Sequence, residues 1–180
     1  MKVGPLPFAN AADSHRLSLF RWQLIGALSF AGERFSEGQQ VANFTSSLRK
    51  VTRALGVRFQ DVVWGLKLEY GRWSDRPHFH FVLAGLSGSQ VCVATCERLK
   101  RAWHQKSGAR EADIEVFVSA ENGLEYIAKR PLPRPANAVR STAKFGVNGE
   151  DMLFSQNFVR LATHKPPRVR TRSFDSFLRE

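Results

Sequence analysis

The sequence predicts an α+β fold in which a mostly antiparallel sheet is covered by helices. Strand-like and helix-like hydrophobic patterns alternate along the chain, and two strand-like runs near its middle are joined by a short polar turn. The chain has 180 residues, 43% of them hydrophobic, which is enough apolar material for one core. We therefore expect one folded domain over residues 1–162, with its core at about 20–161, and a basic arm over residues 163–180.

A strand and a long helix are expected in the first third of the chain. Residues 1–12 contain two prolines and should form a loop, whereas residues 22–30 (WQLIGALSF) have the pattern of a buried strand. The helix should begin at Ser36, whose side chain can cap it, and end at about Leu55, directly before Gly56. Its apolar residues recur at helical spacing, at Val41, Phe44, Leu48, Val51 and Leu55.

A hairpin is expected next, and shorter elements follow it. Residues 61–71 (DVVWGLKLEYG) and 76–86 (RPHFHFVLAGL) have strand character, with residues 72–75 as the polar turn. A helix should follow from Ser89 to about Lys106, where Gly108 ends it, and then a strand over residues 114–118 and a short helix over 120–129. The last segments should be a proline-rich extended segment, a loop over 136–150 and a final strand within 152–161.

The charge balance narrows the class of partner. A formal net charge of +11 and a pI near 10.5 favour a polyanion, either nucleic acid or an acidic membrane surface. No membrane span is expected, because the most apolar stretch (residues 22–30) is far shorter than the roughly 20 residues that a spanning helix needs. Cys92 and Cys96 suggest no disulfide framework, and the N-terminus does not resemble a signal peptide. There is no GxxxxGK[ST] phosphate loop, and we expect no small-molecule cofactor.

Alternation along the second hairpin strand places two histidines on one face. Phe79, Phe81 and Leu83 point one way and can fill a core, while His78 and His80 point the other way. Side chains two residues apart on a strand start about 7 Å apart at the backbone, so the two imidazoles can converge on one metal ion.

Glu69, on the first hairpin strand, completes a candidate metal site. With the predicted turn, Glu69 falls opposite or nearly opposite His78, with the Cβ atoms about 5 Å apart. The same register sends Leu66 and Leu68 to the core, whereas a slip by one residue would bury Glu69 among phenylalanines. Two imidazoles and a carboxylate with open positions suit Mg²⁺ or Mn²⁺. The alternative for a bare histidine pair is an ordinary solvated sheet face.

A tyrosine and a lysine in the expected helix over residues 120–129 supply a second kind of chemistry. Tyr126 and Lys129 are three residues apart and share a helix face. A phenol, with a pKa of about 10, is a poor nucleophile at neutral pH unless a nearby cation stabilises the phenolate or the phosphate under attack. Tyrosine, lysine and a metal ion form a sensible set for phosphoryl transfer, whereas a half-buried tyrosine and a solvated lysine are the ordinary alternatives.

RPHFHFVLAG followed by EYIAKR resembles the HUH endonucleases, and most of all the single-tyrosine replication initiators of rolling-circle plasmids and of small single-stranded DNA viruses or phages. Three motifs in order carry the resemblance: WQLIGALSF, His78-Phe79-His80 and Tyr126-Ile127-Ala128-Lys129. They span roughly residues 22 to 130. Each motif alone is weak, but the ordered trio at this spacing is fairly specific.

The resemblance implies a central five-stranded antiparallel sheet flanked by helices, similar to RNA-recognition folds. It implies Mg²⁺ or Mn²⁺ held by Glu69, His78 and His80. It also implies that Tyr126 attacks an origin phosphate and leaves a 5′-phosphotyrosine and a free 3′-OH, with Lys129 assisting charge and positioning. The chain departs from the family pattern at Ser29, where the first motif often ends in threonine-rich sequence, and it contains no helicase module.

Basic and aromatic residues are candidates for DNA contacts. Each basic residue is more often a plain solvated charge, but together they predict salt-sensitive affinity for DNA. The candidates are Arg49, Lys50, Arg53, Trp73, Arg76, Arg130, Lys165, Arg168 and Arg170.

Three readings of the function stay open. The leading one is an enzyme that nicks single-stranded DNA at an origin hairpin or nick site, with a host helicase or polymerase as further partner. It would act in the cytoplasm of a bacterial host, or in the nucleus if the replicon is a eukaryotic virus. The second is an HUH transposase or relaxase. The third is a non-catalytic module that binds single-stranded nucleic acid, which would present exposed aromatic residues on the sheet face.

Overall fold

The structure, a computed structural model, describes residues 11–30, 36–70, 77–108, 111–118, 124, 127 and 152–158. It contains a five-stranded antiparallel sheet, as predicted, and the strands lie in the order β4-β1-β3-β2-β5. The strands are β1 (Leu24–Ser29), β2 (Val63–Tyr70), β3 (Pro77–Ala84), β4 (Ala112–Val116) and β5 (Met152–Phe154). The histidine strand β3 is therefore the central strand of the sheet.

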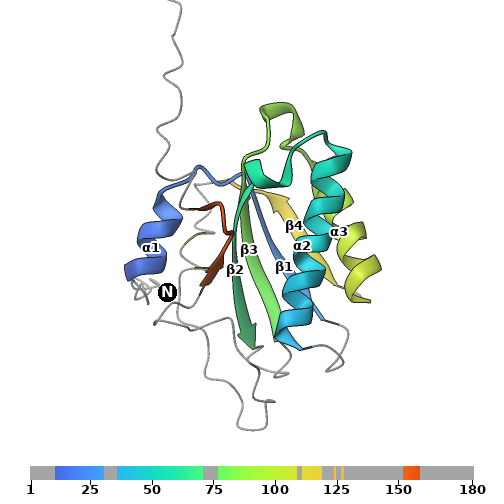
Figure 1. Cartoon of the computed structure of the whole chain (residues 1–180), viewed down its shortest axis with the longest axis horizontal. Coiled ribbons are helices and arrows are strands. Elements are labelled where there is room, and N and C mark those ends of the chain that lie inside the picture. Colours follow the sequence, from blue (N-terminus) through green and yellow to red (C-terminus); the bar gives the residue numbers. More distant parts are fainter. Residues whose placement is uncertain are drawn as a thin grey trace, which may run out of the picture.

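Two long helices cover one face of this sheet. Figure 1 shows α2 (Glu37–Ala54) and α3 (Val93–Ser107) side by side on that face, and α1 (Ala11–Ser18) on the other side. The predicted cap of α2 is confirmed, because the Ser36 side chain accepts a hydrogen bond from the Gln39 backbone N–H. Gly56 and Gly108 follow the two helix ends with φ angles of 70° and 64°, in the left-handed region that favours glycine.

Two sequence predictions about helix starts were wrong. Ser89 does not cap α3: Ser87 instead forms a capping box with Gln90 around a short 3-10 turn, η3 (Gly88–Gln90), and α3 begins after Cys92. Helix α1, which begins at Ala11, was not predicted, because residues 1–12 were expected to form a loop and no helix was expected before Ser36. A second 3-10 turn, η2 (Phe59–Asp61), precedes β2.

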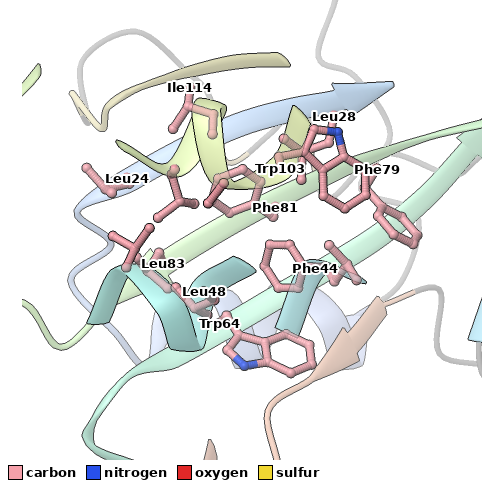
Figure 2. Packing of buried hydrophobic residues seen from close by; sticks show 14 of the residues in the cluster. Leu24, Leu28, Phe44, Leu48, Trp64, Phe79, Phe81, Leu83, Trp103 and Ile114 are labelled. Atoms are coloured by element: carbon pink, nitrogen blue, oxygen red, sulfur yellow. The ribbon is translucent and has the colours of Figure 1, made fainter. Parts of the chain in front are cut away.

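A large apolar cluster fills the space between the sheet and α2 and α3, and we call it the helix-side cluster. Figure 2 shows its aromatic and aliphatic side chains interlocking. It includes Leu24, Leu28, Phe44, Leu48, Trp64, Leu66, Phe79, Phe81, Leu83, Leu99, Trp103 and Ile114. Phe79, Phe81 and Leu83 of β3 belong to this cluster, whereas Val82 and Ala84 belong to a cluster on the opposite face, which confirms the predicted alternation of that strand.

A smaller cluster lies on the opposite face, and we call it the site-side cluster. It contains Leu17, Trp22, Val63, Val82, Ala84, Ile127, Met152 and Phe158. Trp22 also donates its indole N–H to the Leu17 carbonyl at 2.7 Å, and this contact secures the end of α1. Helix α1 therefore depends on contacts with residues outside it, which the periodicity of its own sequence does not reveal.

Phe81→Ala should lower the free energy of unfolding by about 3–5 kcal/mol, because it leaves a cavity beneath Phe44 in the helix-side cluster. Denaturant titration followed by circular dichroism measures this loss. Leu19→Ala, at a residue 44% exposed, serves as the control and should change stability by less than about 1 kcal/mol. An equally small loss for Phe81→Ala would contradict the packing described for β3.

Candidate metal centre

Strand pairing brings the three predicted metal ligands together. Glu69 of β2 lies directly opposite His78 of β3, and His80 follows two residues later on the same face. This confirms the register expected from the sequence. All three side chains lie on the face away from α2 and α3, because Phe79 and Phe81 point toward those helices.

The ligand atoms converge at distances that suit one ion. The His78 Nε2–His80 Nε2 and Glu69 Oε2–His80 Nε2 separations are both 3.1 Å, and His78 Nε2 lies 3.8 Å from Glu69 Oε2. An ion with bonds of about 2.1 Å and ligands at roughly 90–110° would hold neighbouring donor atoms about 3.0–3.4 Å apart. Two of the three separations match this spacing and the third, 3.8 Å, is somewhat wider, so the group can hold a divalent cation with two imidazole nitrogens and one carboxylate oxygen as ligands.

Solvent can reach this centre from one side. The His78 side chain is 26% exposed, whereas those of His80 and Glu69 are 10% and 7% exposed. Toward β1 the neighbouring side chains are small and only half-buried, since Ser29 pairs with His78 and Ala27 with His80. Toward β5 the face is covered by buried side chains, including that of Met152.

Lys67 also belongs to this site, although it was not predicted from the sequence. It lies opposite His80 in the register and is completely buried. Its Nζ forms an ion pair with Glu69 Oε1 at 2.9 Å and donates a hydrogen bond to the Ile127 carbonyl oxygen at 3.0 Å. Period-two alternation could have placed Lys67 on the Glu69 face, but a surface lysine was the ordinary expectation for it.

The surroundings of Glu69 keep its carboxylate ionised. Burial alone would raise the pKa of Glu69, but hydrogen bonds from His80 and Lys67 and the charge of Lys67 outweigh it and lower the pKa to about 2. At neutral pH the carboxylate is therefore negative and available to a cation.

The other predicted site residues fall into two groups. Arg49, Lys50 and Arg53 are exposed on α2, which covers the opposite face of the sheet, so the structure does not bring them to the metal centre. The Arg49 guanidinium stacks over the Phe59 ring, and Lys50 donates to Gln105 of α3. The remaining candidates lie outside the described residues: Trp73, Arg76, Tyr126, Lys129, Arg130, Lys165, Arg168 and Arg170.

One described residue connects the centre to the tyrosine motif. Ile127, which follows Tyr126 in the sequence, is helical and almost fully buried in the site-side cluster. Its carbonyl oxygen is the acceptor for Lys67. The backbone of Ile127 is thus one hydrogen bond and one ion pair away from Glu69.

No family model matches the chain, and no curated protein matches it. Among solved structures, it is similar to the N-terminal nuclease domain of non-structural protein 1 of minute virus of mice, with a TM-score of 0.37 and 11% identity over 88% of this chain and 74% of that one. That domain is described as coordinating Zn²⁺ in its active-site pocket and recognising DNA at the origin of replication. A similarity this weak does not assign the chain to a family.

No helix within the described ranges is long and apolar enough to cross a membrane.

Proposed function

We propose that this protein is a metal-dependent endonuclease of the HUH type, which nicks and rejoins single-stranded DNA through Tyr126. The observation that carries the proposal is the convergence of Glu69, His78 and His80 on the central strands of an antiparallel sheet, at ion-binding distances. The backbone of Ile127 beside this cluster supports a role for the neighbouring tyrosine. The biological setting that we propose is initiation of rolling-circle replication of a plasmid, phage or virus.

The proposed reaction needs little beyond these residues. Glu69, His78 and His80 would hold Mg²⁺ or Mn²⁺, which when bound would polarise the scissile phosphate and leave positions open to its oxygens. The Tyr126 oxygen loses its proton and bonds to phosphorus, the bond from phosphorus to the 3′ oxygen breaks, and that oxygen is protonated to a free 3′-OH. Lys129 would offset negative charge on the phosphate, and attack by a 3′-OH on the phosphotyrosine would reverse the step.

Covalent trapping tests the proposal. The protein is incubated with a pool of labelled single-stranded oligonucleotides and Mn²⁺ and then examined by denaturing gel and by mass spectrometry. A DNA adduct on Tyr126 that is lost when EDTA is present is the expected result, and it would also reveal the target sequence. Binding without an adduct, across a pool broad enough to include bound sequences, would contradict the enzyme and favour a binding module.

The non-catalytic alternative finds little support in the sheet itself. In an RNA-recognition module, aromatic side chains on the open sheet face stack on bases. None of the described residues of β1 to β4 on the metal-site face is aromatic. The aromatic residue of β5 on this face, Phe154, packs against Phe158, with ring centroids 4.6 Å apart.

The placement of α2 leads to a prediction about DNA affinity. Because Arg49, Lys50 and Arg53 lie across the sheet from the metal centre, replacing all three with glutamine should leave the nicking rate of a short oligonucleotide within about threefold. On longer DNA, where α2 can contact phosphates, the DNA association constant of the same variant should depend less steeply on salt concentration than that of the wild type. Nicking rates and salt titrations by fluorescence anisotropy measure the two effects. A large loss of rate on the short substrate would contradict the separation of α2 from the site.

A further inference from the structure

Lys67 is a charged residue in an environment that normally excludes charge. Its side chain is completely buried, yet its Nζ lies within 3.0 Å of two acceptors, Glu69 Oε1 and the Ile127 carbonyl oxygen. A buried ammonium group is stable only when such partners replace water. Glu69 is one of the candidate metal ligands, and Ile127 follows Tyr126 in the sequence.

We propose that Lys67 is a positioning residue that fixes the Glu69 carboxylate and holds Ile127, the residue after Tyr126, beside the metal centre. The role in catalysis rests on the proposed function, whereas the contacts of Lys67 with Glu69 and Ile127 do not.

The first contact determines how Glu69 can bind a cation. Lys67 occupies the side of Oε1, while Oε2 faces the imidazole nitrogens of His80 and His78 at 3.1 and 3.8 Å. Glu69 would therefore offer one oxygen to the ion instead of two, which leaves a further coordination position for substrate. The Lys67 charge also cancels that of Glu69, so a divalent ion would keep its net attraction for a phosphate.

The second contact determines where the tyrosine motif can lie. Ile127 is held twice, by its side chain in the site-side cluster and by its carbonyl oxygen on Lys67. Neighbouring Cα atoms are about 3.8 Å apart, so fixing Ile127 strongly restricts the position of Tyr126. Displacement of a reacting group by about 1 Å can cost about 100-fold in rate.

Lys67→Met tests this role, because methionine keeps much of the length and removes the charge. With Mn²⁺ present, we expect kcat for nicking to fall about 100-fold while KM for DNA changes less than about threefold. Mn²⁺ affinity should stay within about tenfold, since all three ligands remain. Amide exchange of the peptide spanning Ile127 should accelerate at least about tenfold. Lys106→Met, at an exposed residue of α3, is the matched control and should change none of these quantities.

A wild-type measurement covers the case in which Lys67→Met does not fold. In protein labelled with ¹⁵N-lysine, one ammonium signal should be protected from solvent exchange and broadened by Mn²⁺. Absence of such a signal overturns the proposal, as does a folded Lys67→Met variant with unchanged amide exchange and unchanged kcat. If wild-type protein binds Mn²⁺ and shows the protected signal but never nicks DNA, the proposed function fails while the positioning role of Lys67 stands.

Discussion

Tyr126→Phe is expected to lower the nicking rate by at least about 10⁴-fold, because loss of the nucleophile removes the covalent step entirely. The substitution deletes one oxygen and leaves the ring, so the affinity for single-stranded DNA should stay within about threefold of wild type. Quantitative gels give the rate, and mass spectrometry should find no DNA adduct on the variant.

The chain contains a matched control for this experiment. Its only other tyrosine, Tyr70, adjoins Glu69 at the end of β2. Tyr70→Phe should keep the adduct at Tyr126. Equal nicking by wild type and Tyr126→Phe would mean that another residue or a water molecule is the nucleophile. Loss of DNA binding together with cleavage in Tyr126→Phe would instead indicate a structural role.

His80→Ala is expected to produce the second largest effect. His80 Nε2 lies 3.1 Å from both other ligand atoms, so it occupies the centre of the group, and its removal leaves only one imidazole and one carboxylate. Affinity for Mn²⁺ should fall by at least about 100-fold. Loss of a residue that only hydrogen-bonds to a metal ligand typically costs about 10- to 100-fold, and loss of a ligand itself should cost more. Nicking at a fixed low Mn²⁺ concentration should fall in parallel, and EDTA should have the same effect on the wild type.

Calorimetric titration with Mn²⁺ measures the affinity of each variant. His15→Ala, at an exposed histidine of α1, is the control for loss of an imidazole and should bind Mn²⁺ like the wild type. If His80→Ala nicks DNA normally with Mn²⁺, the metal assignment of this cluster is wrong. If it binds Mn²⁺ weakly but nicks well at high Mn²⁺, the cluster binds the metal and His80 has no further role.

The convergence of Glu69, His78 and His80 could be predicted because a hairpin leaves few choices of register. Counting back from the turn places Glu69 opposite His78, and the alternative register would bury a carboxylate among phenylalanines. The same argument separates Phe79 and Phe81 from the histidines. Local chemistry was equally informative at the start of α2, where Ser36 is both the predicted and the observed cap.

Features that depend on distant contacts could not be predicted in this way. The burial of Lys67 depends on Ile127, which is 60 residues away in the sequence. Helix α1 is secured by Trp22 and the site-side cluster, and it has only eight residues. The connection from β1 to β2 determines on which face of the sheet α2 lies, and this connection could not be predicted from the sequence. Arg49, Lys50 and Arg53 were therefore predicted as DNA contacts from their charge alone.

The two faces of β3 have different roles: one packs in the hydrophobic core, and the other carries two of the candidate metal ligands. Odd-numbered positions such as Phe79 and Phe81 pack under α2 and α3, and the helix-side cluster contains none of the candidate metal ligands. Substitutions on the even-numbered face can therefore alter the chemistry while most of the hydrophobic stabilisation stays intact. The sheet can therefore tolerate a change of the side chains at His78 and His80 with few compensating changes in the helix-side cluster.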